Sequence, residues 1–175
     1  MNGKRLTLVM AISLSLLSLW ALESCNKNNS TTSYQTDGTL TASINGTAYS
    51  AKSYVVSDYI NSFGSIIVQG ETISGSDTVG LQVSIPYILP LDTAISVTNS
   101  AYAGYAAIAY QIPGKEYDCY FDLGASHGTI TLTSADTVNH QVAGTFSGVL
   151  YNKDNATGDS VVLTNGAFNS AYQVQ

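Results

Sequence analysis

Acidic side chains gather at one place in the sequence, in the pattern Glu116-x-Asp118-x-Tyr120-x-Asp122. Alternate residues of an extended strand face the same side and stand about 6.6 Å apart. Carboxylates at about that spacing could act as an acid–base pair on a glycosidic bond, or their oxygens could bind a calcium ion. A solvated strand surface carries the same pattern. These four residues are therefore the candidate ion or ligand contacts, with a solvated surface as the alternative, and we assign no catalytic residue.

The two histidines and Cys119 are the other groups that could do chemistry. If a hairpin turns near Asp136, His127 and His140 lie four or five residue pairs apart, roughly 13–17 Å, which is too far to share one zinc ion. Cys119 alternates with apolar residues in Tyr117-x-Cys119-x-Phe121-x-Leu123, on the face opposite the carboxylates. This pattern predicts a buried thiol of the core. We expect neither a metal site nor a cofactor.

The composition indicates one all-β domain that does not bind nucleic acid. The chain has 175 residues, a formal net charge of −6 and only 10% charged residues. Binding to nucleic acid requires basic patches that neutralise phosphates, and this chain has only 6 Lys and Arg residues. Apolar and polar residues alternate with a period of two between turn signals, as in half-buried strands. We predict a single antiparallel β-sandwich or calycin-like barrel of about nine strands at residues 38–175.

Several strands and turns can be placed by residue number. Asn45-Gly46 is a strong hairpin signal, and the segment 79–85 alternates apolar with small or polar residues. The segment 101–112 is apolar on both faces, which predicts a central strand. A second hairpin is expected around residues 134–139, a turn is expected at 154–159, and Gly166 indicates a bulge.

The first residues have the pattern of an export signal that ends at Cys25. Lys4 and Arg5 precede an apolar run from Leu6 to Leu22, which is short for a membrane-spanning helix and typical of a signal peptide. Leu22-Glu23-Ser24-Cys25 resembles a bacterial lipobox, in which the cysteine is acylated and the peptide is cut before it. An uncleaved anchor is the alternative. We predict a signal peptide at 1–24 and lipid attachment at Cys25, whose acyl chains would hold the protein to a membrane.

Residues 25–37 contain no aliphatic side chain, so they predict a flexible tether between the lipid and the domain. The segments Ala42 to Tyr49, Gly128 to Thr133, Val142 to Gly148 and Val162 to Phe168 resemble an uncharacterised family of Bacteroidota outer-membrane lipoproteins. This resemblance covers most of residues 38–172 and implies a lipid-anchored β domain of unknown function, without assigned catalytic residues. By the sorting rules of such lipoproteins, Asn26 implies the outer membrane, and the absence of a charged run after Cys25 favours its periplasmic face.

Four short motifs resemble the O-glycosylation acceptor sequence of exported Bacteroidota proteins, in which Asp precedes Thr or Ser and a small or aliphatic residue follows. The alternative is that Asp closes a turn and the next residues open a strand. The candidate acceptors are Thr78, Thr93, Thr137 and Ser160.

We therefore expect a non-enzymatic binding or scaffold module of the cell envelope, whose partner is another envelope protein or a glycan. Twelve tyrosines and few charges suggest a tyrosine-rich contact surface. The alternative is a barrel-like carrier of a small apolar ligand, which requires an interior that side chains do not fill.

Overall fold

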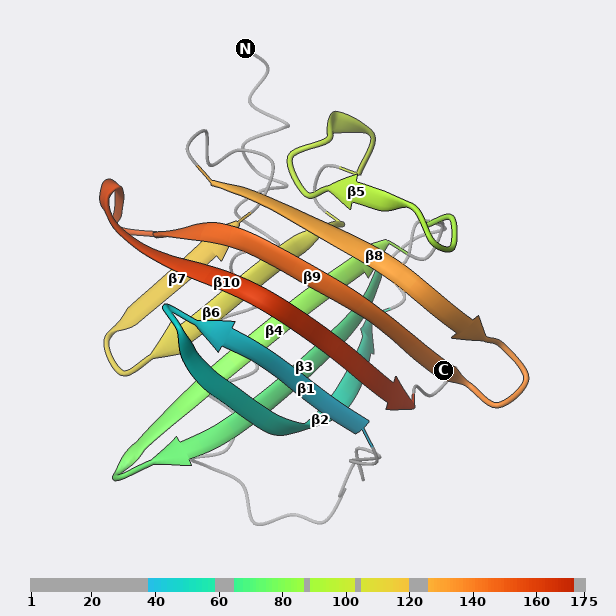
Figure 1. The fold of residues 1–175 in the computed structure, drawn as a ribbon, viewed down its shortest axis with the longest axis horizontal. Helices are drawn as coiled ribbons and strands as arrows, with labels where there is room; N and C mark the ends of the chain where they lie inside the picture. Colours follow the sequence, from blue (N-terminus) through green and yellow to red (C-terminus); the bar gives the residue numbers. More distant parts are fainter. Residues whose placement is uncertain (1–37, 59–64, 87–88, 103–104, 120–125, 172–175) are drawn as a thin grey trace. The chain divides into compact units, whose positions relative to one another are not determined.

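The computed structural model describes residues 38–58, 65–86, 89–102, 105–119 and 126–171, and it confirms the all-β fold (Figure 1). Eight strands close into a barrel in the order β10–β1–β2–β3–β4–β6–β7–β9, and β9 pairs back to β10. All the pairings are antiparallel. The fold is therefore a closed barrel, and the sandwich alternative is excluded. The strands are β1 (Gly38–Ile44), β2 (Thr47–Asp58), β3 (Ser65–Ser74), β4 (Asp77–Pro86), β5 (Ala94–Ser96), β6 (Ala107–Ile112), β7 (Lys115–Cys119), β8 (His127–Asp136), β9 (Gln141–Asn152) and β10 (Asn155–Ala171).

Two strands, β5 and β8, extend the barrel wall. One edge of β9 pairs with β10. Its other edge is shared between two strands: β8 pairs with residues 141–149, and the described part of β7 pairs with residues 151 and 152. β5 then pairs with the free edge of β8. In Figure 1, β8, β9, β10 and β1 run side by side in front of β4, β6 and β7.

The core lies inside the barrel and follows the alternation that the sequence predicts. Val83 of β4, Ile108 of β6 and Leu150 of β9 have no accessible surface. Aromatic rings fill the space over glycines on the neighbouring strand. A β-carbon at Gly144 would overlap the Phe168 ring, and one at Gly166 would overlap the Phe146 ring. The two rings stack with their centroids 6.4 Å apart, so the interior beside β9 and β10 is closely packed.

The predicted hairpin turn at Asn45-Gly46 and the predicted bulge at Gly166 are both confirmed. Asn45 and Gly46 have positive φ angles of 49° and 82°, as a tight two-residue hairpin requires. The Asn45 side chain also accepts a hydrogen bond from the Val162 amide at 2.8 Å, which ties this turn to β10. The pairing of β10 with β9 shifts between Leu163 and Gly166, where the bulge was predicted.

The prediction of a central strand over residues 101–112 is wrong in its first part. Ser100–Tyr102 forms a 3-10 turn, η2, and the strand begins only at Ala107. A short apolar run does not by itself distinguish a strand from a turn, and here Ala101 is exposed while Tyr102 is half-buried. No helix among the described residues has the length and apolar character needed to cross a membrane.

Candidate functional site

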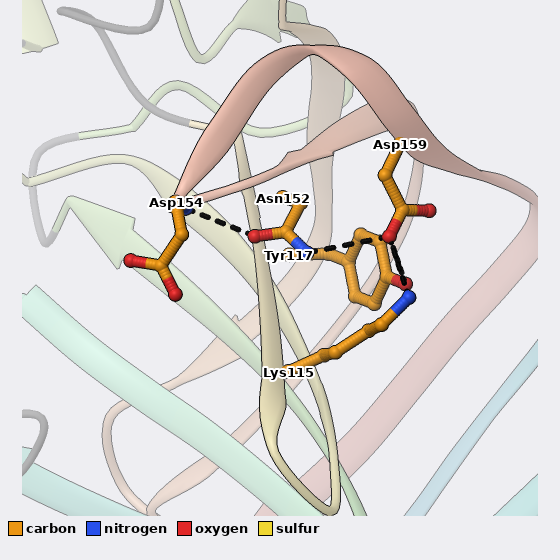
Figure 2. A network of polar contacts seen from close by, with 5 residues as sticks. All are labelled: Lys115, Tyr117, Asn152, Asp154 and Asp159. Carbon is orange, nitrogen blue, oxygen red and sulfur yellow. Dashed lines mark hydrogen bonds and ion pairs between the residues drawn. The ribbon is translucent and has the colours of Figure 1, made fainter.

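A group of polar side chains joins the β6–β7 hairpin to the β9–β10 hairpin. We call Lys115, Tyr117, Asn152 and Asp159 the Asp159 network. Three donors meet one carboxylate oxygen, Asp159 Oδ2, at 2.7 Å from Lys115 Nζ, 3.1 Å from the Tyr117 hydroxyl and 3.3 Å from Asn152 Nδ2. Figure 2 shows these side chains converging while the Asp154 carboxylate points away from them. Asn152 Oδ1 accepts a hydrogen bond from the Asp154 amide at 2.9 Å, which fixes the side-chain amide.

Charge and hydrogen bonding keep Asp159 ionised. The hydrogen bond from Lys115 lowers the pKa of Asp159, and the bonds from Asn152 and Tyr117 act in the same direction against the effect of burial. The Asp159 partner in turn raises the pKa of Lys115. A general base works best with a pKa near the working pH, so a carboxylate held in this way is poorly suited to take up protons. The arrangement is that of a structural clamp between two hairpins.

Two of the described tyrosines, Tyr49 and Tyr117, belong to the core. Tyr117 is buried and lies 6.0 Å from Tyr110, measured between ring centroids. Tyr49 is also buried, and its hydroxyl donates to the Gly70 carbonyl oxygen at 2.7 Å. Burial raises the pKa of Tyr49 and Tyr110, so both phenols stay protonated. The other described tyrosine side chains, those of Tyr102, Tyr105, Tyr110 and Tyr151, are half-exposed. The side chains of six of the twelve tyrosines lie outside the described part of the chain, so the tyrosine-rich contact surface stays a prediction.

Two of the four candidate ion or ligand contacts lie on β7. Glu116 Oε2 pairs with Lys153 Nζ at 3.3 Å, and the Lys153 amide donates to the Glu116 carbonyl oxygen at 2.9 Å. Asp118 is only 5% exposed, so the prediction of a solvated strand surface is wrong at this position. The Ser126 hydroxyl donates to the Asp118 carbonyl oxygen at 2.8 Å, so the residue immediately before β8 lies beside Asp118.

The buried position of Asp118 changes its acidity. Its pKa is raised from 3.8 to about 7, mainly by burial and also by the negative charge of Glu116, while the positive charge of Lys153 acts in the opposite direction. Asp118 therefore changes charge near neutral pH. The other two candidates, Tyr120 and Asp122, lie outside the described residues, so the four-residue contact stays a prediction.

The predicted core thiol is confirmed. Cys119 is fully buried on the inner face of β7, and burial together with the Asp118 charge raises its pKa to about 12. Such a thiol is not an activated nucleophile. His127 opens β8, whereas His140 lies in the turn before β9, with the length of β8 between them. Within the described stretches, no three His, Cys, Asp or Glu side chains lie close enough together to hold a metal ion.

Of the four candidate acceptors of O-linked glycan, Thr78 is the second residue of β4, Thr93 and Thr137 lie between strands, and Ser160 lies within β10. Each of these side chains is exposed, as a modification would require. Thr93 makes a hydrogen bond of 3.3 Å to the Leu91 carbonyl oxygen, which leaves its hydroxyl oxygen accessible. Glycosylation of Thr78, Thr93, Thr137 and Ser160 stays a prediction, as does lipid attachment at Cys25, which lies outside the described residues.

One surface was not predicted from the sequence. Outward Thr and Ser residues of β8, β9, β10 and β1 form what we call the hydroxyl face. The strand register places Thr131, Thr145, Ala167 and Thr41 in one row across these four strands. The charged residues of these strands, Asp136 and Asp159, lie near hairpin ends. The hydroxyl face comprises Thr39, Thr41, Ser43, Thr129, Thr131, Thr145, Ser147 and Thr164.

Comparisons of the chain with protein-family models, with curated proteins and with solved structures find no match. They assign no family, and the resemblance to Bacteroidota lipoproteins stays a prediction. A function has to be inferred from the residues and their geometry.

Proposed function

We propose that this protein is a non-enzymatic binding or scaffold module of the cell envelope, which contacts its partner through the outer surface of the barrel. The observation that carries this proposal is the filled interior. An eight-stranded barrel is just wide enough either to be filled by side chains or to hold one small ligand. The burial of the inward-facing residues distinguishes these two cases.

Inward side chains from several sides of the barrel have no accessible surface. They include Leu40 of β1, Val68 of β3, Ile108 of β6 and Leu150 of β9. A cavity large enough for a water molecule would leave accessible surface on the side chains that line it. At the level of these residues the interior is therefore packed, and recognition is assigned to the outside.

The hydroxyl face is the surface that best fits this role. The protein as a whole is acidic, with a net charge of −6, but this face has no Asp, Glu, Lys or Arg between the strand ends. A partner that meets it does not have to desolvate charged groups, which is costly when they are left imperfectly paired. Thr side chains have restricted rotamers, so little side-chain entropy is lost on contact. An uncharged glycan or an uncharged patch of an envelope protein would satisfy these conditions.

The site of action follows from the N-terminal sequence. The lipobox at Leu22 to Cys25 supports an acylated Cys25, and residues 26–37 would act as the tether to the barrel. We place the protein at the outer membrane, on its periplasmic face, through its acyl chains. A scaffold that is concentrated at a membrane can work with weak individual contacts, because anchoring raises the local concentration of binding sites.

A carrier of a small apolar ligand is the second candidate. Closure of the strands into a barrel favours it, since barrels of this size hold such ligands in their interior. The packed interior argues against it, because a ligand would have to displace side chains that already fill the space.

Capture of partners from the protein's own membranes tests the proposal. Thr145→Lys places a charge in the middle of the hydroxyl face, whereas Gln111→Lys places one on the outside of β6 as a matched control. We expect cross-linked partners to be lost with Thr145→Lys and kept with Gln111→Lys. If both variants capture what the unchanged protein captures, the hydroxyl face is not the contact surface.

A further inference from the structure

The barrel wall is not equally strong around its circumference. β3 and β4 form ten residue pairs, and β1 and β2 form seven. Within the described part of the chain, β7 and β9 meet at two pairs, Tyr117 with Asn152 and Asp118 with Tyr151. Beyond these pairs the edge of β9 is taken by β8. The short contact between β7 and β9, which we call the seam, is therefore the weakest backbone link in the closed barrel.

Polar side chains reinforce the seam on both faces. On the inner face and at the hairpin end, the Asp159 network ties Lys115 and Tyr117 of β7 to Asn152 and Asp159 (Figure 2). On the outer face, Glu116 is bound to Lys153 through an ion pair and a backbone hydrogen bond. These contacts depend on charge and lie at half-exposed positions, where water competes with them.

The seam also contains a group that opposes closure. Asp118 is buried between Ala109 of β6 and Tyr151 of β9, with Glu116 and Lys153 as its charged neighbours among the described residues. When the Asp118 carboxyl is ionised, it is poorly solvated and is repelled by Glu116. Near neutral pH, part of the population therefore carries this unfavourable charge in the seam.

We propose that the barrel opens at the seam and that the Asp159 network keeps it closed. In the open form the β6–β7 hairpin has separated from β9, while β6 stays paired with β4. β6 and β4 share five residue pairs, so the hairpin stays attached on that side when the two pairs of the seam break. Opening would expose the inner face of the hairpin, including Ile108 and Cys119.

Cys119 is a built-in reporter of this movement. In the closed barrel it has no accessible surface, so a thiol reagent can reach it only after the chain opens. Under conditions where reclosing is fast, the labelling rate measures the population of the open form. The full chain is incubated with iodoacetamide at several low urea concentrations, and alkylation is read on the Cys119 peptide by mass spectrometry.

We expect labelling of Cys119 to depend only weakly on urea, because a local opening exposes little surface. Asp159→Asn removes the charge that Lys115 pairs with and weakens the hydrogen bonds from Tyr117 and Asn152. It should accelerate labelling by about tenfold, as expected for the loss of a charge-assisted contact at a half-exposed position. Asp154 is an exposed carboxylate in the adjacent turn and lies outside the Asp159 network. Its replacement, Asp154→Asn, is the control and should leave the labelling rate of Cys119 unchanged. If labelling has the same urea dependence as global unfolding, no local opening exists and the proposal fails.

Hydrogen exchange provides a test that needs no variant. The Lys153 amide donates across the seam to the Glu116 carbonyl oxygen, and the Asn45 amide donates to the Val162 carbonyl oxygen, both at 2.9 Å and both in hairpin turns. Opening at the seam breaks the first bond and keeps the second. Lys153 should therefore exchange at least tenfold faster than Asn45, after correction for intrinsic rates. Equal protection of the two amides would overturn the proposal.

Discussion

Replacement of Asp118 by Asn should stabilise the protein, and more so at high pH than at low pH. The structure buries this carboxyl and raises its pKa from 3.8 to about 7. Between about pH 4 and pH 7 the folded state therefore holds a proton that the unfolded state has lost, so stability falls as pH rises through this window and is constant above it. Asn has nearly the same shape and no charge, so it removes this loss.

The magnitude follows from the difference between the two pKa values. Each tenfold change in proton affinity is worth about 1.4 kcal/mol. The raised pKa of Asp118 therefore lowers stability by about 4 kcal/mol at pH 8, where folding buries a charge, and by about 2 kcal/mol at pH 5, where folding takes up a proton. These are upper limits, because the surrounding chain can relax around the charge. Asp118→Asn should therefore increase the free energy of unfolding by about 2 kcal/mol more at pH 8 than at pH 5. For a domain of this size, the gain at pH 8 corresponds to a rise in Tm on the order of 10 °C.

Urea denaturation followed by circular dichroism at pH 5 and pH 8 measures both free energies. Asp154→Asn is the matched control, because Asp154 is an exposed carboxylate on the neighbouring turn and its replacement should change stability little at either pH. The reasoning is refuted if Asp118→Asn gives the same change at both pH values. It is also refuted if the Asp118→Asn variant is less stable than the unchanged protein at pH 8, since the ionised carboxylate would then have a favourable partner.

Three further predictions concern the core and the surface. Gly144→Ala should cost about 1–3 kcal/mol of stability, because the new methyl group overlaps both the Phe168 ring and the backbone oxygen of Thr131 on β8; an unchanged urea midpoint would contradict this close packing of β9. Tyr49→Phe should cost about 1 kcal/mol, since it removes the buried hydrogen bond to the Gly70 carbonyl oxygen, and a variant as stable as the parent would show that this bond contributes nothing. If glycan is attached, the intact protein purified from its own membranes should be heavier than the lipidated chain. Replacement of the four acceptors by alanine should then remove the excess mass. A mass equal to that of the lipidated chain contradicts glycosylation. The acceptors are Thr78, Thr93, Thr137 and Ser160.

Local features of the fold could be predicted because their causes lie in neighbouring residues. Asn45-Gly46 accepts the positive φ angles of a tight hairpin. In the segment 79–85 the apolar residues Leu81, Val83 and Ile85 are buried as predicted, although Gly80 and Ser84 between them are buried as well. The bulge before Phe168 was indicated by Gly166. Such signals do not depend on which other strands lie nearby.

Barrel closure and the candidate site depend on pairings between distant residues, which the sequence pattern does not encode. β1 pairs with β10 across most of the chain, and Asp159 meets Lys115 at a separation of 44 residues. Asp118 has the sequence pattern of a solvated strand face, yet the chain near Ser126 lies beside it. The row of hydroxyl groups could not be recognised either, since Thr41 and Thr145 become near neighbours only through β10.

Native mass spectrometry of the protein, purified from its own membranes in mild detergent, tests the central claim most directly. The packed barrel predicts a chain that carries its acyl groups and any glycan but no stoichiometric small molecule, and that is found together with an envelope partner. A small molecule released in a one-to-one ratio on denaturation would contradict this account, because the interior would then hold a ligand and the protein would be a carrier.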